Sequence, residues 1–178
     1  MKNKYFFVLV FLTSTLLAQK NKASFYFNFG AGILKSSKVA APSFENEISV
    51  KMSKYFSSGL VVAYGRGNNG TYKTSSFFQG NMNLYFVPFG NYRKNNLKLG
   101  TGISIINITN AIEVPGICTP PVTDNYFKNL TAAGYNFILE DTHFISEKHF
   151  IGIKLFYQSY PNIKESGWGV FLKWGVRI

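Results

Sequence analysis

Alternation of apolar and polar residues, repeated in eight segments, is the feature that most constrains this 178-residue chain. A period of two residues is that of a β-strand, because successive side chains of a strand point to opposite faces. The pattern is clearest at the end of the chain, where Trp168, Val170, Leu172 and Trp174 alternate with smaller or charged residues. The eight segments are residues 23–34, 44–53, 59–67, 77–87, 97–108, 133–144, 149–159 and 166–178. We therefore expect an all-β chain.

The connections between these segments alternate in length. Short turns are expected at residues 54–58, 90–95 and 147–148, and longer loops at residues 36–43, 68–75, 109–131 and 161–165. Short turns at one end and long loops at the other are typical of an eight-stranded antiparallel up-and-down transmembrane β-barrel. If the first strand starts in the periplasm, all four loops lie outside the cell. The role of the third loop, which holds Cys118, the chain's only cysteine, stays open between function and disorder.

The first eighteen residues have the pattern of a secretory signal peptide. Lys2 and Lys4 precede an apolar run over residues 5–12, and a small residue, Ala18, marks the expected cleavage site. The apolar run is shorter than the ~20 residues that a spanning helix needs. We expect a signal peptide over residues 1–18 and a single barrel domain over residues 19–178.

Alternation alone does not decide whether the apolar face points to lipid or to a soluble core, because a soluble barrel of the lipocalin type alternates too. The polar face is rich in Gly, Ser and Asn, which suit the narrow interior of an eight-stranded barrel. The apolar face is rich in bulky residues, and aromatic residues near strand ends suit the two girdles of a membrane barrel. These are Phe25, Tyr64, Phe86, Tyr135, Tyr157, Trp168 and Trp174. This favours the membrane interpretation.

Three stretches resemble the small outer-membrane β-barrel proteins of Gram-negative bacteria, the OmpA/OmpX-type group, and particularly the short barrels of Bacteroidetes-like genomes. They are the signal ending Leu16-Leu17-Ala18-Gln19, the Lys54-Tyr55-Phe56 turn, and residues 171–178. The resemblance covers essentially all of the mature chain and implies the cell outer membrane as its location. It also implies that Trp174, Val176 and Ile178 form a terminal signal for the barrel-assembly machinery. Ile178 departs from the commonest pattern, which ends in Phe or Trp.

Charged residues on the polar face are expected to pair inside the lumen, because an isolated buried ion is costly. Glu45, Glu47 and Glu140 are the expected partners of the cations. The full predicted lumen charge network is Glu45, Glu47, Lys51, Lys98, Glu140, Lys154, Lys173 and Arg177. The network either makes the interior rigid or, alternatively, serves a proton or ion path.

The chain carries 19 basic and 8 acidic residues, a net charge of +11. Such an excess suits an anionic surface, and Arg66 and Lys73 near the outer rim are candidates for contact with lipopolysaccharide phosphates. Nucleic acid is not an expected partner, because the lysines are scattered and no recognition motif is present. Lipid and lipopolysaccharide are the expected partners. The oligomeric state stays open, with a monomer favoured.

Catalytic residues are not expected. His143 and Ser146 are three positions apart, so on a strand their side chains point to opposite faces. Glu140 lies on the strand face opposite to that of Asp141 and His143, which argues against a metal site formed by these three side chains. No cofactor is expected. We expect a non-enzymatic barrel that supports envelope integrity or surface interaction. A narrow pore for small solutes is the first alternative, and a lipid-modifying enzyme the second.

Overall fold

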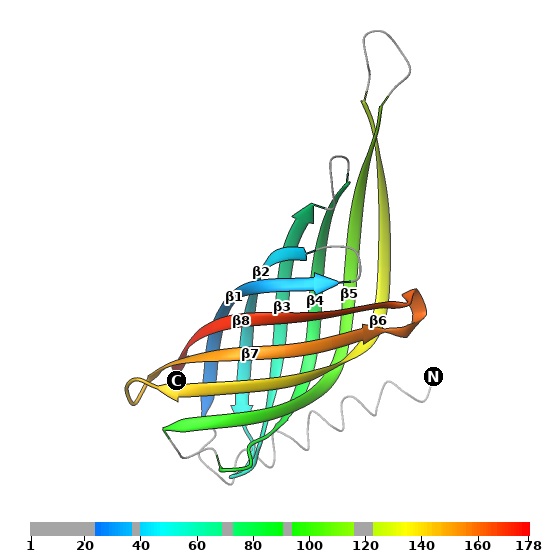
Figure 1. Ribbon diagram of the computed structural model, residues 1–178. Coiled ribbons are helices and arrows are strands. Elements are labelled where there is room, and N and C mark those ends of the chain that lie inside the picture. Colours follow the sequence, from blue (N-terminus) through cyan, green and yellow to red (C-terminus); the bar gives the residue numbers. More distant parts are fainter. Residues whose placement is uncertain (1–23, 37–39, 69–72, 91–93, 116–122) are drawn as a thin grey trace.

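The computed structural model describes residues 24–36, 40–68, 73–90, 94–115 and 123–178, so the expected signal peptide lies outside the described residues. Eight antiparallel strands follow one another around a closed barrel (Figure 1). The expected fold class is confirmed. The strands are β1 (Phe25–Ser36), β2 (Ala40–Lys51), β3 (Phe56–Asn68), β4 (Lys73–Phe86), β5 (Asn95–Pro115), β6 (Thr123–Phe144), β7 (His149–Tyr160) and β8 (Glu165–Arg177).

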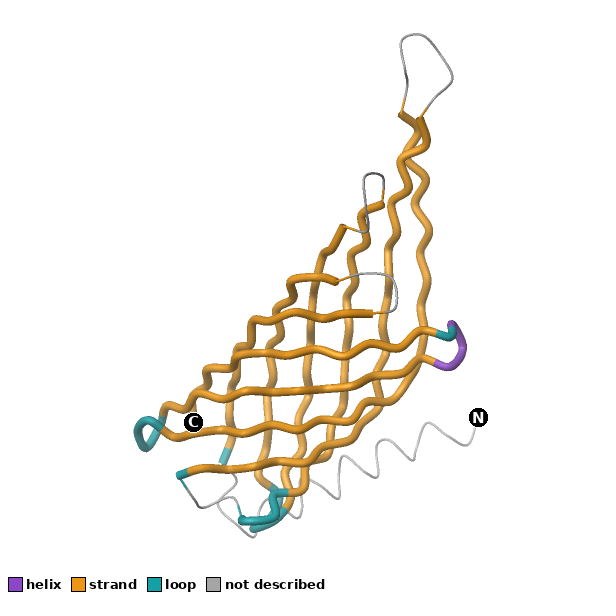
Figure 2. Tube along the Cα trace, viewed as in Figure 1, coloured by secondary structure: helices purple, strands orange, loops and turns teal. Residues whose placement is uncertain are grey.

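The register shows how strongly the strands tilt (Figure 2). Starting from Asn28 and following paired residues through β2 to β5 leads to Gly134 of β6. Starting from the same residue and going the other way round leads to Phe144 of β6, ten positions further along. A stagger of this kind closes a barrel whose strands run obliquely to its axis. An eight-stranded barrel is narrow enough for side chains to fill it.

The two ends of the barrel differ. The turn end holds the connections 52–55, 87–94 and 145–148, and there the backbone N–H of Ile178 donates to the carbonyl of Phe25. The hairpin end holds the other four connections, one of which contains a short 3₁₀ helix, η1 (Pro161–Ile163). No helix among the described residues is long and apolar enough to span a membrane.

Buried and exposed residues alternate along the strands as the sequence predicts. In β2, Ser43, Glu45 and Glu47 are buried, whereas Phe44 and Ile48 are more than half exposed. All seven aromatic residues expected in the girdles point outward, with exposed fractions from 42% to 52%. A polar interior inside an apolar exterior is the reverse of a soluble barrel, and so large an apolar surface needs lipid to cover it. The chain is a transmembrane barrel.

The largest correction concerns the expected loop over residues 109–131. Instead, β5 continues to Pro115 and β6 starts at Thr123, so only residues 116–122 lie outside the described chain. Polar side chains pair across the two strands, where Thr109 Oγ1 donates to Asn129 Oδ1 at 2.8 Å. Polar residues on both faces and several prolines made this hairpin look like a loop. The expected loops 36–43 and 68–75 and the turn 54–58 are also shorter than predicted.

The extended parts of β5 and β6, residues 107–115 and 123–134, form what we call the projecting hairpin. Here β6 pairs with β5 alone, because its pairing with β7 begins only at Tyr135. Figure 1 shows the hairpin rising well beyond the rest of the barrel.

Candidate functional site

The middle of the lumen holds a cluster of six ionisable side chains contributed by five strands. We call it the ionic cluster. Its members are Glu45 and Glu47 from β2, Lys98 from β5, Glu140 from β6, Lys154 from β7 and Lys173 from β8. All are buried except Lys98, whose side chain is partly exposed. Each side chain points inward because of its position in the alternating pattern.

Lys173 lies at the centre of the ionic cluster. Its ammonium group donates to Glu47 Oε2 at 2.5 Å and to Glu140 Oε2 at 2.7 Å. It also lies 3.9 Å from Glu45 Oε1. One lysine thus connects carboxylates from strands on different sides of the barrel.

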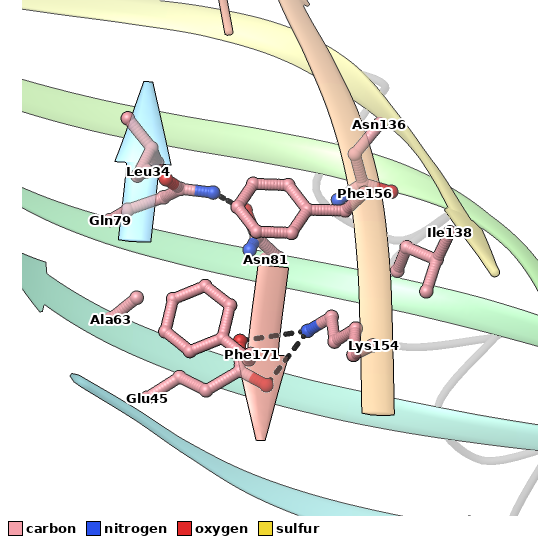
Figure 3. A pocket seen from close by; sticks show the side chains of 10 residues that line it. All are labelled: Leu34, Glu45, Ala63, Gln79, Asn81, Asn136, Ile138, Lys154, Phe156 and Phe171. Atoms are coloured by element: carbon pink, nitrogen blue, oxygen red, sulfur yellow. Dashed lines mark hydrogen bonds and ion pairs between the residues drawn. The ribbon is translucent and has the colours of Figure 1, made fainter. Parts of the chain in front are cut away.

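The other two lysines complete the pairing. Lys154 donates to both carboxylate oxygens of Glu45, at 3.0 and 2.8 Å (Figure 3). Lys98 donates to Glu140 Oε1 at 2.7 Å. Three carboxylates therefore face three ammonium groups, so the charges balance. Paired and hydrogen-bonded charges avoid the large cost of an isolated ion in a low-dielectric interior.

A chain of neutral groups extends the ionic cluster. The hydroxyl of Tyr85 donates to Glu47 Oε1 at 2.9 Å, and Asn83 donates to that hydroxyl at 3.2 Å. Asn136 in turn donates to Asn83 Oδ1 at 2.9 Å. Tyr85 was not among the predicted site residues. The signal for it was a large aromatic hydroxyl on a face otherwise made of small polar residues.

Two layers of mostly apolar side chains flank the ionic cluster. On the turn end, the ring centroid of Tyr26 lies 6.3 Å from that of Phe144 and 6.0 Å from that of Phe150. On the hairpin end, the apolar layer consists of Leu34, Ala41, Phe77, Ile106, Ala132 and Tyr160. The cluster is therefore enclosed from both sides.

Described residues line two small cavities next to the ionic cluster, each with a volume of about 10 Å³. The first is lined by Glu45, Gln79, Asn136 and Lys154 among others (Figure 3). Gln79 Oε1 and Asn136 Oδ1 have no hydrogen-bond partner among the described residues, and neither does Ser57 Oγ, which lines the second cavity. A polar cavity of this size suits about one water molecule. Neither cavity is large enough for an organic solute.

Two of the eight predicted lumen charges lie outside the ionic cluster. Lys51 is only half-buried, and Arg177 is exposed. Both occupy the last position of a strand at the turn end, so their side chains reach the barrel rim although their positions in the alternation point inward. Of the predicted lipopolysaccharide contacts, Arg66 is exposed on β3, and the side chain of Lys73 lies outside the described set.

The residues considered for catalysis do not come together. His143 Nδ1 contacts Asn95 Oδ1, while Ser146 Oγ accepts from the backbone N–H of His149 at 3.0 Å. Asp141 is exposed on the outer face and Glu140 is buried in the lumen. The described residues contain no group of three His, Cys, Asp or Glu able to hold a metal ion.

The predicted assembly residues lie on the outer face at the turn end. The indole of Trp174 stacks on the ring of His149, with centroids 5.7 Å apart. Val176 is half-buried, and Ile178 is 82% exposed. The terminal side chains are thus accessible from outside the barrel.

Known proteins share the fold but little sequence. No protein-family model matches the chain, and no curated protein matches it by sequence. A major outer membrane protein from Thermus thermophilus aligns with a TM-score of 0.69 at 9% identity, over 88% of this chain and 99% of that one. The Pseudomonas aeruginosa outer membrane protein OprG aligns with a TM-score of 0.64 at 10% identity, over 88% and 95%. Yersinia pestis Ail aligns with a TM-score of 0.58 at 8% identity, over 88% and 97%. The fold is that of small outer-membrane barrels.

Proposed function

We propose that this chain is a closed, non-conducting outer-membrane barrel that holds the projecting hairpin outside the cell for surface contact. The observation that carries the proposal is the filled lumen. The ionic cluster fills the middle with mutually paired charges, and mostly apolar side chains flank it on both sides. A solute path would require these ion pairs to break.

The projecting hairpin supports the surface half of the proposal. β5 and β6 contain 21 and 22 residues, whereas a strand of about 9–11 residues crosses a bilayer. The extra length lies at the hairpin end, opposite the end where Phe25 and Ile178 meet. If the barrel end at which Phe25 and Ile178 meet faces the periplasm, the hairpin reaches the medium. Long exposed elements on a rigid scaffold commonly carry binding functions.

Planar bilayer recordings separate this proposal from the narrow pore. We expect no steady single-channel conductance from the refolded wild-type protein. Steady conductance that changes when Lys154 or Glu140 is neutralised would favour the pore. The Asp141→Asn variant is the matched control, since this carboxylate lies outside the lumen.

Two further experiments address the surface role and the enzyme alternative. Protease added to intact cells should cut within the projecting hairpin and leave a protected barrel fragment. Full protection of the hairpin in intact cells would contradict the proposed orientation.

Lipid A from cells that overproduce the protein should be unchanged. A modified lipid A that reverts to the normal form in the His143→Ala variant would favour an enzyme.

A further inference from the structure

One outward position in β2 breaks the apolar pattern of the lipid-facing surface. Asn46 points outward and is exposed, while its inward neighbours Glu45 and Glu47 belong to the ionic cluster. Along the strand, the adjacent outward residues are Phe44 and Ile48. Asn46 is thus a polar side chain in the middle of the outer face of its strand.

The neighbouring strands surround Asn46 with further apolar side chains. Phe29 of β1 is its register partner on one side, and Val62 of β3 on the other. Together with Phe44 and Ile48 of β2, these two residues are the four outward neighbours of Asn46, and their exposed fractions range from 42% to 54%. The rings of Phe29 and Phe44 stack with centroids 6.1 Å apart. Apolar residues on all four sides place Asn46 within the lipid-facing belt and away from its rims.

The side chain of Asn46 makes no hydrogen bond with any other described residue. Its amide has two N–H donors and one carbonyl acceptor, and the hydrocarbon core of a membrane offers partners for neither. Outward Thr101 differs, because its Oγ1 donates to the carbonyl of Asn136 at 3.0 Å. A polar group in a membrane normally finds its partner in another protein surface.

We propose that two copies of this chain associate in the membrane through the outer face of β2, with Asn46 at the centre of the interface. A carboxamide is self-complementary, because its N–H donates to the same kind of carbonyl that it carries. Two copies with the same membrane orientation are related by a two-fold axis along the bilayer normal. Such an axis can place a residue opposite its own copy. No lipid group at this depth offers both a donor and an acceptor, which favours protein as the partner.

Cysteine crosslinking in native membranes tests the geometry. In a Cys118→Ser background, which removes the chain's only cysteine, we expect Ile48→Cys, which lies beside Asn46 on the outer face of β2 and keeps its amide, to form a disulfide dimer of twice the chain mass. Phe137→Cys is the matched control, since Phe137 is 56% exposed on the outer face of β6, four strands away. Equal dimer formation by both variants would overturn the proposal. So would the absence of a dimer in Ile48→Cys, or its crosslinking only to a protein of another mass.

A second variant tests the role of the amide. Asn46→Leu should weaken self-association in bilayers by about tenfold, measured by energy transfer between labelled copies at increasing lipid dilution. Thr101→Val should leave association unchanged, because the outward hydroxyl of Thr101 already donates to the carbonyl of Asn136 in the same chain. Heat-modifiable migration on a gel verifies that each variant is folded. An unchanged dissociation constant for Asn46→Leu would mean that the amide does not hold an interface.

Discussion

The barrel body and the projecting hairpin are made from the same strands but are supported differently. In β6, residues 135–144 pair with β5 on one side and β7 on the other, whereas residues 123–134 pair with β5 alone. The ionic cluster lies in the body, and so do most residues of the two layers that flank it, whereas Ala132 of the apolar layer comes from the projecting hairpin. The difference indicates that the body carries the stability and the hairpin depends on it. Regions with few packed contacts open at low free-energy cost.

The largest expected effect comes from neutralising a carboxylate of the ionic cluster. Glu140→Gln keeps the size of the side chain but leaves Lys98 without its carboxylate partner and Lys173 with one fewer. Breaking a buried ion pair in this way costs about 3–5 kcal/mol. The free energy of unfolding in urea, measured by tryptophan fluorescence in detergent micelles, should fall by about this amount.

Asp141→Asn provides the control on the adjacent residue. This carboxylate is exposed on the outer face of the same strand, so its loss should change the free energy of unfolding by less than about 0.5 kcal/mol. Equal destabilisation by the two variants would mean that the ionic cluster does not stabilise the body.

Two glycines test how tightly the body is packed around the cluster. A Cβ at Gly59 would lie 2.6 Å from Glu47 Oε1 and 3.2 Å from Tyr85 Cε2, whereas a Cβ at Gly80 meets nothing within 4 Å. Gly59→Ala should therefore lower the free energy of unfolding by about 1–3 kcal/mol. Gly80→Ala should leave it unchanged or raise it slightly. Tolerance of both substitutions in the same urea titration would contradict a filled lumen.

The smallest effect is expected from shortening the projecting hairpin. Ile112 and Tyr126 are register partners, so replacing residues 113–125 by Asn-Gly joins them through a tight turn. The free energy of unfolding should change by less than about 1 kcal/mol, because the lost residues pair with neither β4 nor β7. In the intact protein, amide hydrogens of residues 123–134 should exchange faster than those of residues 136–143. A large loss of stability would show that the hairpin supports the barrel.

Much of the barrel body was predictable from the sequence, because alternation fixes which residues share a face. Phe44 and Ile48 point outward and Glu45 and Glu47 inward, as expected. The hairpin was not predictable in the same way. Its residues, such as Thr109 and Asn129, are polar without facing a lumen, so neither lipid nor a core imposes a pattern on them. Alternation of apolar and polar residues therefore no longer predicts a strand where that strand extends beyond the membrane.

The pairing within the ionic cluster was predictable only in part. Lys98 and Glu140 are direct register partners on neighbouring strands. Lys154 and Glu45 lie 109 residues apart, on β7 and β2, and meet only across the lumen. Their meeting depends on the stagger of the closed barrel, which no local pattern encodes. Alternation assigns Arg177 to the inward face of β8 but does not indicate that this position lies at the exposed rim.

Heat-modifiable migration of the protein from fractionated cells tests the central claim most directly. A closed outer-membrane barrel should appear in the outer-membrane fraction, and the unheated sample should migrate differently on a gel from the boiled one. The Glu140→Gln variant should convert to the unfolded form at a lower temperature than Asp141→Asn. Recovery of the protein in the soluble fraction without detergent, with one migration whether heated or not, would contradict the account.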